Sequence, residues 1–272
     1  MSYTIGFIGA GNMSGAIIGG MIAKGIAPER IIASNRGREK LDALQSKFGI
    51  RVAQDNLEAA QADVVVLSVK PQMMKAVCEA LKPGLGHNPL LVTVAAGLEV
   101  SSYQRWLGDH IALVRCMPNT PSLVGKGASG LYANDNVSAA QRQQVEQLMQ
   151  SVGITQWVEK ESLINAVIAV AGSSPAYCFL IMEAMIEEGV RQGLTHAVAK
   201  ALTIQALAGA AELAAQSDVE VDELKRRVMS PGGTTEQAIF SLEDGNLREI
   251  FSRAMQRCAN RADEMAKQMG EQ

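Results

Sequence analysis

The sequence predicts an α/β protein in which a doubly wound sheet is followed by an all-helical domain. Up to Val158, short β-rich runs alternate with amphipathic helical patterns. Beyond Glu161 this alternation is lost, and helical patterns separated by breaks remain. Alternating strands and helices indicate a largely parallel sheet with helices on its faces. A length of 272 residues favours two domains, which we expect at residues 1–159 and 160–272.

The first domain shows its strand and helix signals in alternation. The expected strands are residues 4–8, 31–34, 64–69, 90–94, 111–115, 130–133 and 154–158. Amphipathic patterns predict helices at 13–24, 38–48, 72–81 and 100–107. Gly25 and Gly49 stand where a glycine ends a helix. Ser138 and Gln141 form a capping-box pattern that begins a further helix, which we expect to end near Gly153.

The second domain has few charges along its helical patterns. Breaks at 172–175, 193–195, 217–219 and 230–233 separate these patterns. Between residues 197 and 215 the only charged side chains are those of Lys200 and Glu212. Such a surface is unfavourable in water, so we expect part of it to be buried in a homodimer interface. The all-α domain is thus predicted to be a dimerisation domain, and a higher oligomer of dimers is compatible with it.

Composition argues against several classes of function. The 25 Lys and Arg residues face 28 Asp and Glu residues, a net charge of −3, which gives no basic footprint for nucleic acid. The three His and four Cys residues show no metal-ligand spacing, so we expect no metal site. No targeting pattern is seen, and polar or glycine residues interrupt each apolar stretch before about 18 residues. We expect a cytoplasmic protein without a membrane span.

The first predicted strand leads into a glycine-rich turn and then a helix. Gly9 permits the tight turn, and Gly11 lets the backbone approach a pyrophosphate. The helix that follows offers free N–H groups and the positive end of its dipole. Ser14 stands where the strict pattern has a third glycine, and its small side chain still allows close packing. This turn predicts a Rossmann-type dinucleotide site, and a glycine turn without a ligand is the alternative.

The end of the second predicted strand indicates which dinucleotide binds. An acidic residue at this point would accept hydrogen bonds from the ribose 2′-hydroxyl of NAD. This chain has Ser34, Asn35 and Arg36 there, which are hydrogen-bond donors suited to a 2′-phosphate. We therefore predict NADP, with NADPH preferred and NAD possible. The alternative is that Arg36 and Arg38 only begin a solvated helix.

Two further segments are expected along the cofactor cleft. In a doubly wound sheet, ligands bind beyond the carboxyl ends of the strands. The third predicted strand is followed by a Lys-Pro sequence, at which the chain turns sharply. The fourth ends in small residues that let a ligand approach the backbone closely. The predicted cleft is therefore lined by Ser68, Val69, Lys70, Pro71, Ala95, Ala96 and Gly97.

A loop in the second domain has the features of an anion site. Pro231, Gly232 and Gly233 precede a helix for which Thr234 is the expected N-cap, with Gln237 completing a capping box. A loop and a helix N-terminus can bind a small carboxylate without Lys or Arg. An ordinary capped helix is the alternative. At the break at 172–175, we expect a serine N-cap at position 174 with proline at the first helical position, and a simple kink is the alternative.

Five segments together resemble the pyrroline-5-carboxylate reductase family. They are GFIGAGNM at 6–13, VKPQ at 69–72, RCMPNTPSLVGKG at 115–127, GSSPAY at 172–177 and SPGGTT at 230–235. MPNTP and SPGGTT are the specific ones, since many dehydrogenases share the glycine turn. The resemblance spans essentially the whole chain. It implies a Rossmann domain, a helical domain that interlocks with its twin, and reduction of a cyclic imine to L-proline, the last step of proline biosynthesis.

The resemblance also implies roles for individual residues. The pyrophosphate would lie on Ile8, Gly9, Ala10, Gly11, Asn12 and Met13, and the adenosine end on Ser34, Arg36 and Asn56. Thr235 would bond the ring nitrogen and is the expected catalytic residue. The substrate would also be bound by Glu161, Ser230, Gly232, Gly233 and Thr234. A cyclic imine is basic enough to bind protonated, so hydride transfer from NADPH needs no strong protein acid.

Two other functions fit part of the pattern. A β-hydroxyacid dehydrogenase shares the plan of the two domains, but it needs a catalytic lysine on the first long helix of the second domain. Residues 163–187 contain no lysine. A non-catalytic NADP-sensing protein would bind NADPH without oxidising it. An assay of NADPH consumption with pyrroline-5-carboxylate and with hydroxyacids separates the three.

Overall fold

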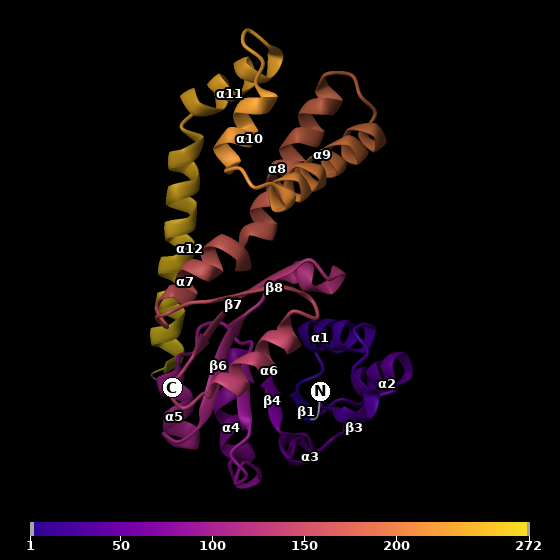
Figure 1. The fold of residues 1–272 in the computed structure, drawn as a ribbon, viewed down its shortest axis with the longest axis vertical. Coiled ribbons are helices and arrows are strands. Elements are labelled where there is room, and N and C mark those ends of the chain that lie inside the picture. Colours follow the sequence, from indigo (N-terminus) through magenta and orange to yellow (C-terminus); the bar gives the residue numbers. More distant parts are fainter. Residues whose placement is uncertain (1–2, 271–272) are drawn as a thin grey trace. The chain divides into compact units, whose positions relative to one another are not determined.

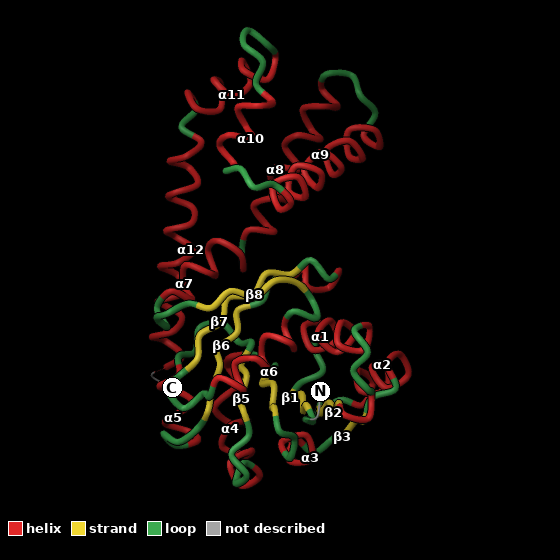
Figure 2. Tube along the Cα trace, in the orientation of Figure 1, coloured by secondary structure: helices red, strands yellow, loops and turns green. Residues whose placement is uncertain are grey.

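A computed structural model describes residues 3–270 and shows an eight-stranded sheet. The strand order is β3-β2-β1-β4-β5-β6-β7-β8 (Figures 1 and 2). The strands are β1 (Ile5–Ile8), β2 (Ile31–Ser34), β3 (Arg51–Ala53), β4 (Val64–Leu67), β5 (Leu90–Thr93), β6 (Ala112–Met117), β7 (Gly127–Ala133) and β8 (Gly153–Trp157). The pairs from β3 to β6 are parallel, β7 is antiparallel to β6, and β8 is parallel to β7. The predicted, largely parallel sheet is confirmed.

Helices cover both faces of this sheet. They are α1 (Asn12–Ala23), α2 (Arg38–Phe48), α3 (Asn56–Ala60), α4 (Met74–Leu81), α5 (Val100–Leu107) and α6 (Ala139–Met149). Alternate residues of β1, β2, β4, β5 and β6 enter two different apolar clusters, because successive strand side chains point to opposite faces. One cluster includes α1, α2 and α6, and the other includes α3, α4 and α5. The doubly wound arrangement is therefore confirmed.

Most predicted boundaries agree with the structure, with a few differences. Gly25 and Gly49 have φ values of 83° and 69°, so both helix ends are confirmed. The capping box of Ser138 and Gln141 is also present, but α6 ends at Met149, before Gly153 begins β8. The sequence patterns do not predict β3 and α3, because elements this short carry no periodic signal.

The chain forms two compact units, each described by itself. The sheet unit comprises Met1–Ser173 and Cys258–Gln272, and the helical unit comprises Ser174–Arg257. These limits differ from the predicted domains, because α7 (Leu163–Val167), the π-turn Ile168–Gly172 and the end of α12 (Leu247–Gly270) belong to the sheet unit. There Ile164, Ile168 and Ala262 form a small buried cluster with its own apolar neighbours.

The helical unit buries few of its own side chains. It contains α8 (Ser174–Arg191), α9 (His196–Gln216), α10 (Val221–Val228), α11 (Thr234–Asp244) and the start of α12. Helices α8 and α9 pack on each other, yet α8, α10 and α11 have no buried residue. Because α8 begins at Ser174, the predicted N-cap at that position is wrong by one residue.

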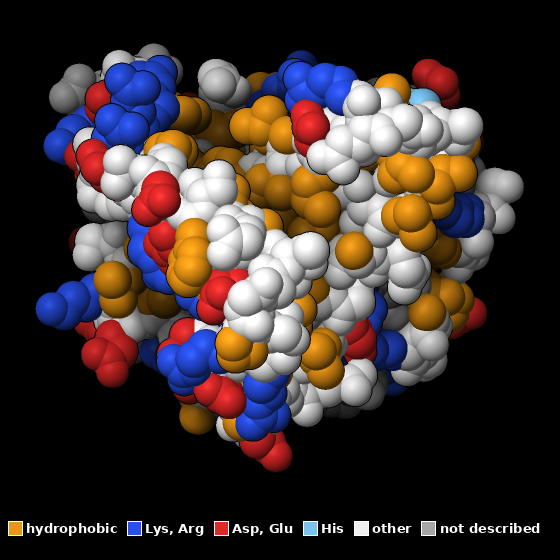
Figure 3. All heavy atoms as spheres, turned by 90° about the horizontal axis from the view of Figure 1, so that it is seen from above, with side chains coloured by type: hydrophobic (Ala, Val, Ile, Leu, Met, Phe, Trp, Pro, Cys, Tyr) orange, Lys and Arg blue, Asp and Glu red, His pale blue; other side chains and the backbone are white. Residues whose placement is uncertain are grey.

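Apolar side chains are exposed on both long helices of this unit. Phe179 and Leu180 on α8 are 62% and 66% exposed, and Leu202 and Leu213 on α9 are 59% and 58% exposed. Orange apolar groups are visible at the surface in Figure 3. The segments Leu163–Arg191 and His196–Gln216 are also long and apolar enough to span a membrane. Length and composition alone do not show a membrane span, so the expectation that the chain has none stays a prediction.

Candidate active site

The predicted cofactor residues gather at one edge of the sheet. They lie at or just beyond the carboxyl ends of β1, β2, β3, β4 and β5, with Asn56 following β3. Strand order reverses between β1 and β4, because β1 is followed by β2 on one side and β4 lies on the other. A ligand crevice is expected outside such a switch point. The sheet thus brings the turn at Gly9, the end of β2, and the exits of β4 and β5 to one edge.

The glycine turn has the geometry that a dinucleotide requires. Gly9 has a φ of 106°, and a Cβ atom there would lie 2.6 Å from the backbone oxygen of Ser68. Gly11 is the N-cap of α1 in an extended conformation, and nothing lies within 4 Å of where its Cβ would be. The first position therefore needs glycine to fold. The second leaves open space at a helix N-terminus, which fits a pyrophosphate.

Ser14 explains the departure from the strict glycine pattern. It is fully buried, and its hydroxyl donates a hydrogen bond of 2.6 Å to the carbonyl oxygen of Gly9. The backbone N–H of Gly9 donates to the carbonyl oxygen of Ser34 at 2.8 Å. Both polar groups of Gly9 are satisfied inside the protein, so the turn is rigid before any ligand binds.

At the end of β2, Ser34 is turned into the protein. It is fully buried, and its hydroxyl lies 2.8 Å from Asn56 Oδ1 and 3.2 Å from the carbonyl oxygen of Phe7. A hydroxyl has a single hydrogen, which these two acceptors share. We therefore expect Ser34 to hold Asn56 in place and not to bind a 2′-phosphate through its hydroxyl. The backbone of this segment remains next to the cleft.

The two arginines after β2 differ in their partners. Arg38 pairs with Asp42 at 2.8 Å. Arg36 is exposed, and its Nη2 lies 3.6 Å from the Met73 sulfur. Within residues 3–270, no carboxylate forms an ion pair with Arg36. Asn35 is used locally, since its amide donates to the Gly37 carbonyl at 3.0 Å. Of these two arginines, Arg36 is thus the one without a carboxylate partner among the described residues.

The segments that follow β4 and β5 are held in place mainly by backbone contacts. The N–H of Ser68 donates to the Ile8 carbonyl at 2.9 Å, and Lys70 and Pro71 begin a short 3₁₀ turn over Pro71–Met73. After β5, Gly97 has a φ of 75°, and a Cβ there would lie 3.0 Å from Met269 Cε. Val69, Ala95 and Ala96 complete the two segments. These two segments therefore present mainly backbone and small side chains to the cleft.

Glu161 lies in an ion pair that the sequence patterns do not reveal. Its Oε1 accepts hydrogen bonds from Arg115 Nη1 at 2.6 Å and from the Val100 N–H at 2.7 Å. The Arg115 side chain is 6% exposed and that of Glu161 is 23% exposed. Arg115 is a charged residue within a buried strand, and such residues are almost always paired. That position in β6 is the signal that could have indicated a partner.

The predicted anion loop has a helix start that differs by one residue from the expected one. The N-cap of α11 is Gly233, and Thr234 is the first helical residue, so the predicted capping box with Gln237 is wrong. Glu236, in the first turn, accepts a hydrogen bond from the Gly232 N–H at 2.9 Å. Gly232 has a φ of 69°, which glycine adopts without strain. The N-cap Gly233 has no side chain with which to cap α11, so the first-turn N–H groups of the helix keep room for an anion.

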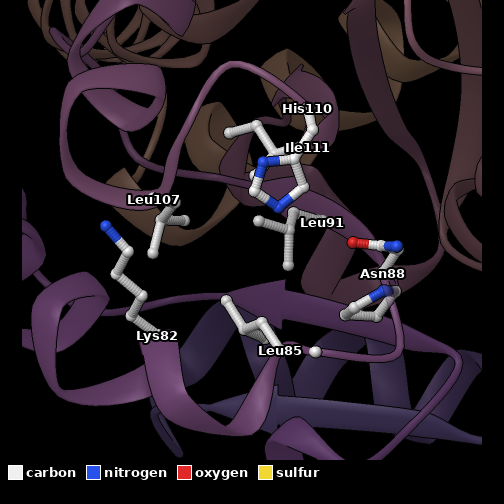
Figure 4. Close-up of a pocket in the computed structure, with 9 residues that line it drawn as sticks. Lys82, Leu85, Asn88, Leu91, Leu107, His110 and Ile111 are labelled. Carbon is white, nitrogen blue, oxygen red and sulfur yellow. The ribbon is translucent and has the colours of Figure 1, made fainter.

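Other polar groups of the sheet unit lie away from the cleft. A cavity of about 160 Å³ lies at the amino ends of β5 and β6, with His110, Asn88 and Lys82 at its rim (Figure 4). This is the edge opposite the glycine turn.

Burial raises the pKa of the Cys78 and Cys116 thiols to about 12, so both stay protonated. Within the described part of the chain, no group of His, Cys, Asp and Glu could hold a metal ion.

Comparison with known proteins gives consistent matches along the chain. Residues 161–265 match the family model described as pyrroline-5-carboxylate reductase dimerisation. Residues 4–97 match the model described as NADP oxidoreductase, coenzyme F420-dependent. A pyrroline-5-carboxylate reductase from Pseudomonas aeruginosa is 50% identical over 268 residues, which is 98% of each chain.

Solved structures agree with the sequence matches. A pyrroline-5-carboxylate reductase from Coxiella burnetii has 46% identity and a TM-score of 0.95, and the match covers 98% of this chain and 99% of that one. A pyrroline carboxylate reductase from Plasmodium falciparum, with NADP bound, has 29% identity and a TM-score of 0.85 over 97% and 98% of the two chains.

Proposed function

We propose that this chain, which belongs to the pyrroline-5-carboxylate reductase family, reduces 1-pyrroline-5-carboxylate to L-proline with NADPH. The main support for this proposal is that the chain is 50% identical to a pyrroline-5-carboxylate reductase over 98% of that protein. The geometry supports the same reaction, since a glycine turn suited to a dinucleotide and a helix start suited to a carboxylate occur in one chain. The reaction is the last step of proline biosynthesis.

The cofactor residues of this proposal follow the edge of the sheet. The turn from Ile8 to Met13 would hold the pyrophosphate on the N-terminus of α1. Arg36 would bind the 2′-phosphate, a role supported by its lack of a carboxylate partner among the described residues. Asn56, fixed by Ser34, would lie on the adenosine side. The segments 68–71 and 95–97 would flank the ribose and nicotinamide, and the bound cofactor supplies the hydride.

The substrate residues of this proposal belong to the loop before α11. The free N–H groups at the start of α11 would bind the substrate carboxylate, with Thr234 contributing its backbone and Gly233 forming the N-cap of the helix. Gly232 gives its N–H to Glu236, which leaves the later groups for the ligand. Thr235, at the second helical position, would orient the ring nitrogen through its hydroxyl. Ser230 accepts from the Gly233 N–H at 2.9 Å and closes the loop.

Such residues suffice for imine reduction. The imine nitrogen already carries its proton, so the hydride adds to the ring carbon and the C=N bond becomes a C–N bond. The chain then has only to bind the substrate carboxylate and to hold the ring in the orientation that hydride transfer needs, which excludes unproductive orientations of the ring. Positioning of this kind accounts for large rate effects. It needs no histidine or cysteine, in agreement with the protonated, buried state of Cys78 and Cys116.

The helical unit supports assembly into a homodimer. Its long helices expose Phe179, Leu180 and Leu202, and its sequence matches a dimerisation family model. We therefore propose that these apolar surfaces are covered by a second copy and not by lipid, in a cytoplasmic enzyme. Assembly of dimers into a larger oligomer would use other surfaces.

The decisive experiment follows NADPH consumption by the purified chain. With pyrroline-5-carboxylate, we expect NADPH to be oxidised and proline to accumulate in equal amounts. With hydroxyacids and NADP, we expect no reduction of the cofactor. Activity with a hydroxyacid alone would make the chain a β-hydroxyacid dehydrogenase. NADPH binding without turnover of any imine would make it a sensor.

A further inference from the structure

We propose that Arg115 and Glu161 are positioning residues, which hold the 95–97 loop against the cofactor cleft through the start of α5. This inference rests on the proposed function, since that loop is taken to flank the nicotinamide. It assigns Glu161 a role through the backbone instead of a direct contact with the substrate.

The contacts of Glu161 are the first step of the argument. One oxygen, Oε1, accepts from both Arg115 Nη1 at 2.6 Å and the Val100 N–H at 2.7 Å. Val100 is the first residue of α5, so its N–H has no partner within the helix. Glu161 therefore caps α5 from 61 residues away in sequence. The N-cap residue Glu99 makes no side-chain cap of its own.

Burial makes this capping contact rigid. The Arg115 side chain is 6% exposed and lies on a central strand, where it cannot swing out to solvent. Removing its partner would leave a buried charge uncompensated, which is strongly unfavourable. Arg115 thus fixes the carboxylate, and the carboxylate fixes the start of α5.

A second contact fastens the same loop at its other end. Thr93, the last residue of β5, shares a hydrogen bond of 2.6 Å with the Tyr103 hydroxyl. The Thr93 hydroxyl also accepts from the Ala95 N–H at 3.3 Å. Thr93 and Arg115 are register partners on adjacent strands. Burial raises the pKa of Tyr103 far above its usual value, so the phenol stays protonated and able to donate.

The loop between these two anchors cannot position itself. It consists of Ala95, Ala96 and Gly97, whose side chains offer no polar group. Gly97 is in the left-handed conformation, and Met269 Cε lies 3.0 Å from where its Cβ would be. The loop position is thus set by Thr93 and Tyr103 before it and by Val100, Glu161 and Arg115 after it. A small displacement of a positioning loop can lower turnover by about two orders of magnitude.

The test compares Glu161→Ala, Glu161→Gln and Arg115→Met in the full chain. We expect Glu161→Ala and Arg115→Met to lower kcat on the order of tenfold and to raise the Kd of NADPH several-fold. Both should also increase the isotope effect of NADPH deuterated at the transferred hydrogen, because hydride transfer becomes slower than release. Glu161→Gln should have a smaller effect, since an amide oxygen still accepts from the Val100 N–H. Glu159→Gln, an exposed neighbour, is the control and should change nothing.

Two results would overturn the proposal. If Glu161 contacts the substrate directly, its variants will raise the KM of pyrroline-5-carboxylate, while Arg115→Met leaves that KM unchanged. If the pair is only structural, melting temperatures will fall while kcat per folded enzyme, the NADPH Kd and the isotope effect stay constant. Should Arg115→Met not fold, Glu161→Ala still decides through its NADPH Kd. A wild-type chain without imine reductase activity would refute the proposed function, and the NADPH Kd would still test the loop.

Discussion

The Glu236 carboxylate accepts a hydrogen bond of 2.9 Å from the backbone N–H of Gly232. The carboxylate therefore lies at the start of α11, beside the N–H groups proposed to bind the substrate carboxylate. It orders a loop whose Gly232 has a φ of 69°, and it also brings a like charge toward an anionic ligand. Order and repulsion act in opposite directions, so two substitutions separate them.

We expect Glu236→Gln to lower the KM of pyrroline-5-carboxylate by about two- to fivefold, because the amide keeps an acceptor for Gly232 and removes the charge. Glu236→Ala should raise the same KM, because the loop loses its hydrogen bond. Steady-state kinetics at saturating NADPH measure both. An increase in KM for Glu236→Gln would contradict the argument and make the charge itself necessary.

The glycine turn supplies a matched pair of variants. Gly9→Ala would place a Cβ 2.6 Å from the Ser68 oxygen at a φ of 106°, so we expect a loss of stability of about 1–3 kcal/mol or more. Gly11→Ala meets nothing within 4 Å and should melt like the wild type. It should nevertheless weaken NADPH binding, because its Cβ enters the space proposed for the pyrophosphate. Thermal melts and NADPH titrations measure both, and unchanged NADPH binding in Gly11→Ala would refute the pyrophosphate site.

Sequence patterns predicted the sheet well because its strands are strongly apolar and its turns contain glycine. They also predicted the segments that border the crevice, since the carboxyl ends of parallel strands share one edge. The pairing of Arg115 with Glu161 could not be predicted, because it joins residues far apart in sequence. The hydroxyl of Ser34 pointed to a ligand in the sequence and points to Asn56 in the structure. Periodicity and motifs do not specify which way a polar side chain turns.

The start of α11 shows a second limit of prediction from sequence patterns. Threonine followed three residues later by glutamine is typical of a capping box. In this chain the preceding Gly233 takes the N-cap position, and Glu236 bonds back to the loop instead. The two possible registers differ by one residue and satisfy the same pattern, so only the backbone geometry distinguishes them.

The exposed apolar side chains on α9 allow the proposed homodimer to be tested. Leu202 is 59% exposed, and we expect Leu202→Glu to shift the chain from dimer to monomer, because a charge in an apolar interface is unfavourable. Sedimentation velocity measures the shift, and wild-type chain mixed with lipid vesicles provides the control for membrane binding. A monomeric wild type that sediments with vesicles would contradict the homodimer proposal.

The guanidinium of Arg36, which has no carboxylate partner among the described residues, is the basis of a prediction about the choice of cofactor. We expect Arg36→Asp to raise the KM of NADPH about tenfold or more while changing that of NADH little, since only NADPH carries the 2′-phosphate. Arg38→Ala is the matched control, because Arg38 already pairs with Asp42 and should affect neither cofactor strongly. Equal effects of Arg36→Asp on both cofactors would remove Arg36 from the 2′-phosphate site.

Thr235 provides the sharpest test of the substrate site. It occupies the second position of α11, where its hydroxyl is proposed to orient the ring nitrogen of the bound imine. Thr235→Ala should therefore lower kcat by about ten- to a hundredfold, since a lost orienting hydrogen bond lowers turnover without removing the cofactor site. The Kd of NADPH should stay within twofold of the wild type.

Ser241→Ala is the control for Thr235→Ala, because Ser241 is an exposed hydroxyl residue on the same helix and makes no proposed contact with a ligand. It should keep wild-type kinetics and a wild-type melting temperature. Thr235→Ser should recover most of the turnover that Thr235→Ala loses, since it restores the hydroxyl without the methyl group. If Thr235→Ala turns over as fast as the wild type, the hydroxyl takes no part in orienting the imine, and the N–H groups of α11 must hold the substrate alone.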